Sequence, residues 1–562
     1  MTSPKSKPSA RRPRSGNPQG RRQRPHAPRL NSNPTRSGPR ILDAVHDQHG
    51  ASWFRYGTDT RSIWFAMADL VRAQSQVFGR LAEINAPVLT ARSITAFKTE
   101  IEDHTTFGEA LVATRPGWLK NHFVFGDGSV ISPKDDGRKV ICTFEPDIRF
   151  RSRGTLAEWQ KLFDPFVQQQ VLVHFAVAFA LVGPLLRFVA RGQLNPQVEI
   201  VGDQETGKSA IGVLASSIWA GDPNSDVGGG ESLDGTFNSF DEVKSFRRDS
   251  FAFLDEANLV GSSPGHRSGF LQDLIFKNSS NRGKRRMGDP SALENASLAI
   301  LSTTNIPLKD LVTRENASIR AMRSRLITIT LAPGRPFGVL DTVPTGYASA
   351  EAAIEALQSA ADECWGTPAR RFVGKLVQRA NRDEDRLRRR VARDIVRARQ
   401  ALADVPCSTR VKKTLALVAV AGSLASEWDV FPEAWGSPTA MIRAIVRLMQ
   451  DDQPGVSASP IESVRAFAER HQDGIVDLTN KKPMSKGDFD NCPGFLRNQK
   501  QLTELLIPTV RFQNEFPDYK MILDALESDG LLKPENGEQK KRSVKAPRGI
   551  CAGKRVYCIR IT

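Results

Sequence analysis

The sequence has few cysteines, no spacing typical of metal ligands and no long uninterrupted apolar segment. Its six cysteines are scattered, none forms a Cys-x-x-Cys pair, and the eight histidines add no zinc-ligand spacing. This excludes a disulfide scaffold and favours a reducing cytoplasm. The amino terminus also lacks the apolar stretch of a secretory signal. The longest apolar run, 171–186, is interrupted by His174, Gly183 and Pro184. Because a membrane span needs ~20 apolar residues, we expect a buried helix here and no membrane association.

Acidic residues are absent from the first 40 positions, which carry 11 Lys and Arg and eight Pro. The other 522 residues hold 68 basic and 62 acidic side chains, so this tail supplies most of the net charge of +17. The whole chain, with 40% hydrophobic and 25% charged residues, has the composition of a globular protein. Residues 1–40 are predicted to be a disordered tail that serves either solubility or non-specific nucleic-acid binding.

Beyond the tail, the pattern predicts four segments. Residues 41–153 are expected to form a mixed α/β adaptor, with a helix at 93–104 and two strands around the turn at 126–128. Residues 154–346 form the core, in which short apolar strands alternate with segments long enough for crossover helices; this predicts an α/β fold with a parallel sheet. The expected core strands are 198–201, 250–254, 297–301 and 326–331. Residues 347–452 are predicted to be a helical lid, and residues 461–562 a small basic domain.

The strongest motif is a phosphate-binding loop between a predicted strand and a predicted helix. It fits the pattern G-x-x-x-x-G-K-[ST] and consists of Gly202, Asp203, Gln204, Glu205, Thr206, Gly207, Lys208 and Ser209. Glycines let the loop turn its N–H groups toward phosphates, and the helix amino terminus adds a positive dipole end. Lys208 is expected to reach the β- and γ-phosphates of ATP, and Ser209 to bind Mg²⁺. Asp203 and Glu205 must point away from the anion.

Two further strands are predicted to complete an ATPase site. The strand 250–254 ends in Asp255 and Glu256, which we assign to Mg²⁺ binding and to activation of the attacking water, respectively. The strand 297–301 runs on to Asn305, whose amide is expected to contact the γ-phosphate or that water. These assignments predict a P-loop NTP hydrolase.

Basic side chains suggest two more roles. Arg325, and as second choice Arg323, precede the strand 326–331 and are candidates for a finger that reaches the nucleotide of a neighbouring subunit. Between the second and third motifs lies a basic loop. On a central channel this loop is expected to grip DNA phosphates through Arg282, Lys284, Arg285 and Arg286.

Together, these motifs resemble the AAA+ superclass, especially the superfamily 3 type of replicative helicase. From about residue 80 onward, the chain more closely resembles a domain-of-unknown-function family that forms the helicase-like half of phage and integrative-element primase–helicases. Additional motifs carry this resemblance: Gly154-Thr155-Leu156 with Trp159, Gly183-Pro184-Leu185-Leu186, Ser217-Ile218-Trp219-Ala220-Gly221 and Gly235-Thr236-Phe237-Asn238. The resemblance implies an ATP- and Mg²⁺-dependent ring, with a hexamer as the expected form. No primase motif precedes the core, so a separate primase is a candidate partner.

The last segment is predicted to be a winged-helix-like domain, with a helix at 519–532, a basic wing at 540–554 and a strand at 556–561. We therefore expect an ATP-hydrolysing DNA motor of a phage or mobile element, acting as a helicase on single-stranded or forked DNA. Two alternatives stay open. One is an ATP-driven protein remodeller or defence ATPase. The other is a DNA-binding scaffold that uses ATP only as an assembly switch.

Overall fold

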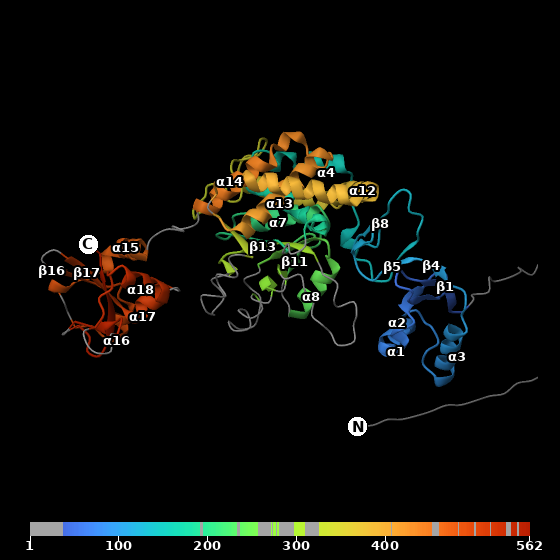
Figure 1. Cartoon of the computed structure of the whole chain (residues 1–562), viewed down its shortest axis with the longest axis horizontal. Coiled ribbons are helices and arrows are strands. Elements are labelled where there is room, and N and C mark those ends of the chain that lie inside the picture. Colours follow the sequence, from blue (N-terminus) through green and yellow to red (C-terminus); the bar gives the residue numbers. More distant parts are fainter. Residues whose placement is uncertain are drawn as a thin grey trace, which may run out of the picture. The chain divides into compact units, whose positions relative to one another are not determined.

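The computed structural model divides into two compact units, residues 1–109 and residues 110–562. The boundary falls inside the predicted adaptor, 41–153, so residues 110–153 belong to the larger unit (Figure 1). The structure describes residues 38–190, 195–232, 237–256, 271, 274–276, 278–279, 297–308, 325–405, 407–451, 460–480, 483–499, 502–516, 519–535, 541–547 and 550–561. The predicted tail therefore lies almost wholly outside the described residues.

The first unit is a four-stranded sheet with helices packed on it. The spatial order of its strands is β3-β2-β1-β4, with β4 parallel to β1 and the others antiparallel. Phe65 and Tyr56 pack against Phe97, which comes from the helix predicted at 93–104. That helix is confirmed, and a capping box of Thr90 and Ser93 sets its start. The elements are β1 (Arg40–His46), β2 (Ser52–Gly57), β3 (Ser62–Ala66), α1 (Asp69–Arg72), α2 (Gln74–Glu83), α3 (Ala91–Glu102) and β4 (Gly108–Glu109).

The larger unit opens with short strands that join its main core. β6, β7 and β8 form an antiparallel sheet, in which β7 and β8 are the two strands predicted around the turn at 126–128. Trp118, Phe123 and Phe150 belong to the same hydrophobic cluster as the helices around the central sheet. The elements are β5 (Leu111–Ala113), β6 (Gly117–Leu119), β7 (His122–Val124), β8 (Val130–Ile131), β9 (Val140–Cys142) and η1 (Ile148–Phe150).

Five parallel strands form the central sheet, in the order β11-β12-β13-β10-β14. This confirms the predicted parallel α/β sheet. The edge strand β11 has only two residues, too few to carry a sequence pattern. The other strands match the four predicted runs to within three residues at either end. Their bounds are β10 (Gln197–Val201), β11 (Glu231–Ser232), β12 (Ser250–Asp255), β13 (Leu298–Thr304) and β14 (Leu326–Thr330).

Alternate residues of β12 face two different hydrophobic clusters. Phe251 and Phe253 join the cluster made with α5 and α7, whereas Ala252 and Leu254 join one that includes Phe240 of α8. The sheet is therefore buried on both faces, as parallel sheets usually are. The surrounding helices are α4 (Leu156–Val167), α5 (Val171–Ala180), α6 (Val182–Leu185), η2 (Leu186–Phe188), α7 (Lys208–Ser217) and α8 (Phe237–Phe246).

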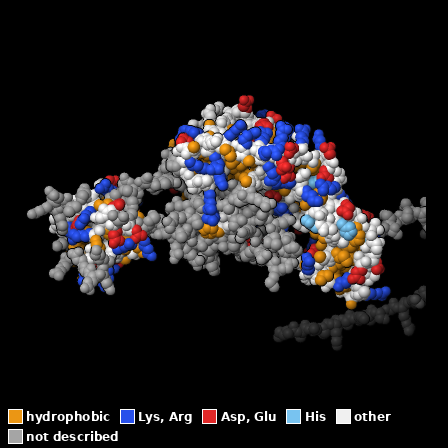
Figure 2. Space-filling model, viewed as in Figure 1, with side chains coloured by type: hydrophobic (Ala, Val, Ile, Leu, Met, Phe, Trp, Pro, Cys, Tyr) orange, Lys and Arg blue, Asp and Glu red, His pale blue; other side chains and the backbone are white. Residues whose placement is uncertain are grey.

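Most of the predicted lid is helical, and it packs on the side of the sheet that carries α5 and α7 (Figure 1). Within α12, Asp383 has a non-helical backbone (φ −167°, ψ 95°), so two helical halves meet there. Lys and Arg side chains gather where Figure 1 labels α12 (Figure 2). The elements are α11 (Ala350–Glu363), α12 (Thr367–Gln400), α13 (Thr409–Glu427), η6 (Glu433–Trp435) and α14 (Pro438–Asp451).

Among the described residues, no single helix is long and apolar enough to cross a membrane. The pair formed by α5 and the following residues 182–188 passes such a test only as a bent pair, with an angle of 48°. Nine of the ten residues of α5 are buried in the protein core, in agreement with the predicted buried helix.

The carboxyl-terminal region has more strands than its sequence predicted. A five-stranded sheet runs in the order β15-β16-β17-β19-β18. The predicted helix and terminal strand are present as α18 and β19. The short strand β18 lies within the predicted wing and pairs with β19. The elements are α15 (Pro460–Arg470), η7 (Gln472–Gly474), β15 (Val476–Asp477), η8 (Leu478–Asn480), α16 (Lys486–Asn491), β16 (Phe495–Gln499), β17 (Leu502–Pro508), α17 (Thr509–Glu515), α18 (Tyr519–Ser528), β18 (Val544–Lys545) and β19 (Arg555–Arg560).

Gly183 is predicted to be essential for packing α6 against β12. A Cβ atom at Gly183 would lie 1.9 Å from the backbone oxygen of Ser250, so Gly183→Ala must displace backbone. We expect a loss of at least ~1–3 kcal/mol of stability. Gly374→Ala in α12 is the matched control, because nothing lies within 4 Å of its added Cβ; it should gain about 0.5–1 kcal/mol. Thermal unfolding of both variants tests this, and equal midpoints would contradict it.

His174 is predicted to make the core sensitive to acid. Burial lowers the pKa of His174 to about 4, from about 6.5 in the unfolded chain. Below pH 6.5 the His174 imidazole is protonated in the unfolded chain, whereas in the folded core it stays neutral down to about pH 4. The free energy of unfolding therefore falls as the pH drops toward 4. The expected loss between pH 7 and pH 5 is about 2 kcal/mol. His174→Leu should remove this part of the pH dependence of the unfolding midpoint; an unchanged dependence would contradict the assignment.

Candidate nucleotide site

The loop between β10 and α7 has the backbone of an anion-binding turn. Gly207 has φ +85° and stands immediately before the first residue of α7. A side chain there would also clash, because its Cβ would lie 2.6 Å from Cδ1 of Ile354 in α11. Glu205 has φ +61°, and its side chain is exposed, as is that of Asp203. The two acids thus lie at the solvent side of the loop, where the sequence required them.

Lys208 is folded back onto its own loop. Its side chain is only 7% exposed, and Nζ donates to the backbone oxygen of Gly202 at 2.9 Å and to that of Asp203. Burial lowers the pKa of Lys208 below its usual range, while the nearby carboxylates of Asp255 and Glu256 act in the opposite direction. The ammonium is therefore desolvated and held by backbone dipoles at the mouth of the loop.

Three oxygen-bearing side chains meet beside Lys208. Ser209 Oγ donates to Asp255 Oδ1 at 3.0 Å, and the hydroxyl of Thr303 donates to the same oxygen. The backbone N–H of Glu256 also points to Asp255 Oδ1, at 3.1 Å. The structure thus brings together the end of β12, the end of β13 and the start of α7. Thr303 was not among the residues chosen from the sequence, although the polar run 302–305 at the end of an apolar strand was a usable signal.

Ser209 and Asp255 are a suitable pair of donors for Mg²⁺, which prefers oxygen ligands and keeps several waters or phosphate oxygens. No group of three or more His, Cys, Asp or Glu side chains able to hold a metal ion occurs in the part of the chain that the structure describes. A metal at this site would therefore depend on oxygens from a nucleotide or from water in addition to the two side chains.

Asn305 and Glu256 lie at the same edge of the sheet. Thr304, just before Asn305, is paired with Val201 in the register, and its carbonyl accepts a bond from the N–H of Gly202 at 3.3 Å. Glu256 has φ +46°, an unusual backbone for a residue with a side chain. The amide and the second carboxylate are thus carried beside the loop by the ends of β13 and β12.

Glu199, in the middle of β10, is a second residue that the sequence analysis missed. Its carboxylate is fully buried and accepts the backbone N–H of Leu308 at 2.9 Å and the hydroxyl of Thr328. It therefore fastens the segment after Asn305 to β14. The signal was an acid within an apolar strand, since a buried carboxylate needs hydrogen-bond partners.

Arg325 lies far from this edge. It precedes Leu326, which pairs with Gln197 at the amino end of β10, so Arg325 is at the opposite end of the sheet from the loop. Its guanidinium stacks over Phe276 at 5.0 Å. Burial, followed by the positive charge of Arg410, lowers its pKa. Arg323 lies outside the described residues. The same holds for all four residues predicted to bind DNA, which are Arg282, Lys284, Arg285 and Arg286.

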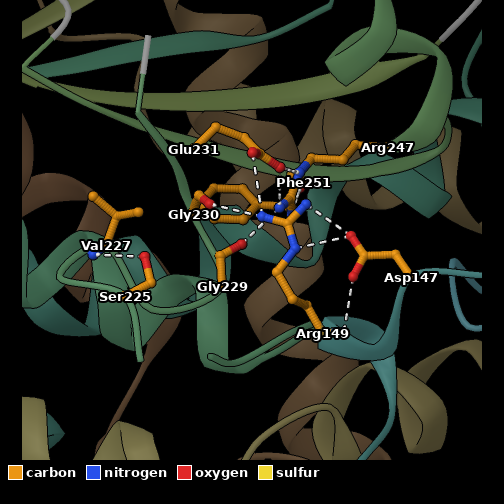
Figure 3. Close-up of polar contacts among 9 residues, drawn as sticks. All are labelled: Asp147, Arg149, Ser225, Val227, Gly229, Gly230, Glu231, Arg247 and Phe251. Carbon is orange, nitrogen blue, oxygen red and sulfur yellow. Dashed lines mark hydrogen bonds and ion pairs between the residues drawn. The ribbon is translucent and has the colours of Figure 1, made fainter. Parts of the chain in front are cut away.

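A buried arginine anchors the edge of the sheet (Figure 3). Arg247 is 1% exposed and donates to Glu231 Oε1 through Nε at 2.9 Å and Nη2 at 2.6 Å. It also donates to the backbone oxygens of Gly229 and Phe251. Its charge lies over the ring of Phe150 at 5.0 Å. The short strand β11 is thereby tied to β12 by a side chain as well as by the sheet ladder.

The same carboxylate connects the sheet to the segment 110–153. Arg149 donates to Glu231 Oε2 at 3.2 Å and to Asp147 at 2.8 Å (Figure 3). Burial alone would raise the pKa of Glu231, but Arg247 and Arg149 outweigh it and lower that pKa. A fully paired cluster of this kind fixes geometry, because removing one charge leaves another buried without a partner.

Comparisons with known proteins give one family match and one informative structural likeness. The model of Domain of unknown function (DUF927) matches residues 40–287, which include the loop, Asp255 and Glu256. No curated protein matches significantly. A solved structure described as SCCmec type IV Cch, an active helicase, is 14% identical with a TM-score of 0.58, and the alignment covers 93% of each chain.

Two other solved structures are more distant. The apo A form of the NrS-1 C-terminal region is 12% identical, with 93% of this chain and 96% of that chain covered and a TM-score of 0.31. The Aeropyrum pernix ORC2 protein in its ADP form is 11% identical, with 64% and 86% covered and a TM-score of 0.19. The likeness to Cch shows that this chain shares the mixed α/β fold of that helicase, with a parallel sheet at its centre.

Proposed function

We propose that the chain is an ATP-hydrolysing DNA motor, a helicase of the AAA+ type from a phage or mobile element. The observation that carries the proposal is the meeting of Lys208, Ser209 and Asp255 at one edge of a parallel sheet. The fold shared with the Cch helicase supports the DNA motor over the two alternatives.

Different groups of the loop are proposed to contact different parts of the triphosphate. The amino end of α7 and the loop N–H groups face the phosphates, and Lys208 supplies a positive charge to the β- and γ-phosphates. Mg²⁺, when bound by Ser209 and Asp255, would neutralise phosphate charge. Thr303 holds Asp255 in place through its hydroxyl.

Glu256 is the proposed base. It accepts a proton as water attacks the γ-phosphorus, and the bond to the bridging oxygen breaks to release ADP. Asn305, at the end of the neighbouring strand, orients the water or the γ-phosphate. Both residues follow strands that end at the edge of the sheet where the loop lies.

Arg325 supports an assembly of several copies. Five strand residues separate its end of the sheet from the loop, about 16 Å at 3.3 Å per residue. At this distance Arg325 cannot reach the nucleotide of its own copy, so we assign it to the nucleotide of a neighbouring copy, with Arg323 as the second candidate. We therefore propose a homo-oligomeric ring, with six subunits as the expected number.

The remaining parts are assigned to DNA. The basic loop with Arg282, Lys284, Arg285 and Arg286 is the proposed grip on single-stranded or forked DNA. The domain 461–562 is proposed to act as a winged-helix-like DNA contact, with the β18–β19 hairpin as its wing. A separate primase is the proposed partner in replication.

ATP hydrolysis with and without single-stranded DNA tests the proposal. Lys208→Ala should weaken ATP binding about 10- to 100-fold, the worth of hydrogen bonds to a charged group. Glu256→Gln should keep ATP binding and reduce turnover about 10²- to 10⁴-fold. Glu83→Gln, an equal change at an exposed position of helix α2, is the control and should have no effect.

Each result separates the three hypotheses. Stimulation by DNA that disappears in Lys208→Ala supports the motor. Hydrolysis that ignores DNA would favour the protein remodeller, and absence of hydrolysis in the presence of tight ATP binding would favour the scaffold.

Thr303→Val tests the support of Asp255 separately. The substitution keeps the side-chain volume and removes the hydroxyl that donates to Asp255, so we expect about a 10- to 100-fold rise in the Mg²⁺ concentration needed for half-maximal turnover. Thr304→Val is the matched control, because the Thr304 hydroxyl is buried and finds no partner among the described residues. If both variants have the same Mg²⁺ requirement, Thr303 does not position Asp255.

A further inference from the structure

Helix α12 carries basic side chains along one face for its whole length. Its 34 residues contain 12 Lys and Arg but only four Asp and Glu. Eight of the basic residues are spaced by three or four positions, so they fall within an arc of about 80° on a helix with 3.6 residues per turn. They are Arg371, Lys375, Arg379, Arg382, Arg386, Arg389, Arg393 and Arg397.

The break at Asp383 does not divide this face. Arg379 on one side of the break and Arg386 on the other line the same surface hollow. The carboxylate of Asp383 accepts the N–H of Arg386 at 2.8 Å and so caps the second half of the helix. The basic face is therefore continuous over two helical segments. Where Figure 1 labels α12, Figure 2 shows many blue side chains with some red ones among them.

Neighbouring acids neutralise only part of this face. Asp394 pairs with Arg393 and Arg397, Glu427 approaches Arg379, and Asp429 pairs with Arg371. These side chains are mostly exposed, and exposed pairs contribute little free energy, so an anionic partner can replace the acids at small cost.

Four members of the face have no ion-pair partner among the described residues. They are Lys375, Arg382, Arg386 and Arg389. The three arginines are exposed. Lys134 and Arg371 line a second hollow together with Lys375 and Arg382, and Asp135 is the only acid there. The face thus has an excess of positive charge that nothing described in the chain balances.

The composition of the face favours duplex over single-stranded nucleic acid. Proteins that hold single strands stack bases on exposed aromatic side chains. The only aromatic residue of α12, Phe372, is fully buried, so the face offers charge without a stacking surface. Regularly spaced arginines and lysines suit the phosphates of a double helix, which carry no sequence information.

We propose that this face of α12 binds the phosphate backbone of duplex DNA, separately from the basic loop proposed to hold the single strand. This inference rests on the proposed function, because DNA is chosen as the anionic partner on the ground that the chain is proposed to be a DNA motor. Duplex binding through α12 needs neither ATP nor Asp255 and Glu256, so its success or failure is measured apart from hydrolysis.

The test compares three full-length variants by the fluorescence anisotropy of a labelled 30-base-pair duplex, without nucleotide. The first combines Arg382→Gln, Arg386→Gln and Arg389→Gln, which keep the helix and remove three unpaired charges. The second replaces the same arginines by lysine. The third, a control of equal charge change, combines Arg72→Gln, Arg80→Gln and Arg92→Gln at exposed positions of the first unit. The basic tail is the same in all of them, so its contribution cancels.

The glutamine variant should bind the duplex at least about tenfold more weakly at 100 mM salt, and the slope of log K against log salt should fall by about 2.7, or 0.9 for each lost phosphate contact. The lysine variant and the first-unit control should stay within about twofold of the unmodified chain. Unchanged circular dichroism and unchanged basal ATP hydrolysis show that the variants fold.

The proposal is overturned if the glutamine variant binds the duplex normally, or if the control loses as much affinity. It is equally overturned if polyphosphate competes as well as duplex at equal charge, or if vesicles with anionic lipid, but not duplex, depend on these arginines. Loss of duplex binding in a chain whose ATP hydrolysis ignores DNA would uphold this surface while refuting the motor.

Discussion

Parallel alignment of the five central strands decides which residues of this chain can meet. All carboxyl ends lie at one edge, so the loop after β10 lies beside Asp255 from β12 and Asn305 from β13, although long stretches of chain separate them. All amino ends lie at the other edge, and Arg325 is there. The parallel alignment thus brings most of the proposed nucleotide site together within one copy. It also keeps Arg325, the proposed arginine finger, away from that site.

Buried polar groups then hold these edges in register. Glu199 links β14 to the segment that follows Asn305, and Arg247 ties the short strand β11 to β12. Glu199 accepts two hydrogen bonds and Arg247 is both hydrogen-bonded and ion-paired, which is the condition under which a buried charge is tolerated. The Glu231 cluster also joins residues 110–153 to the sheet, in addition to the hydrophobic contacts of Trp118, Phe123 and Phe150 with the central core.

Local signals predicted much of this architecture. The glycine and lysine pattern of the loop and the apolar strand before Asp255 are both visible in the sequence. Thr303 and Glu199 were missed because their importance comes from partners on neighbouring strands. Strand β11 and the strands β15 to β17 were missed for a related reason: short strands are defined by the ladder they join more than by their own pattern.

The position of Lys208 has a consequence for ligand selection. Because the Lys208 ammonium donates to carbonyl oxygens of its own loop, those oxygens compete with any incoming anion for the ammonium. A ligand that binds Lys208 must compensate for the loss of these hydrogen bonds, and a single phosphate group offers few new interactions. If the loop binds a triphosphate, as proposed, several charged oxygens of that ligand would meet the lysine, the loop N–H groups and the helix end at once, and the loop would favour a polyphosphate over inorganic phosphate.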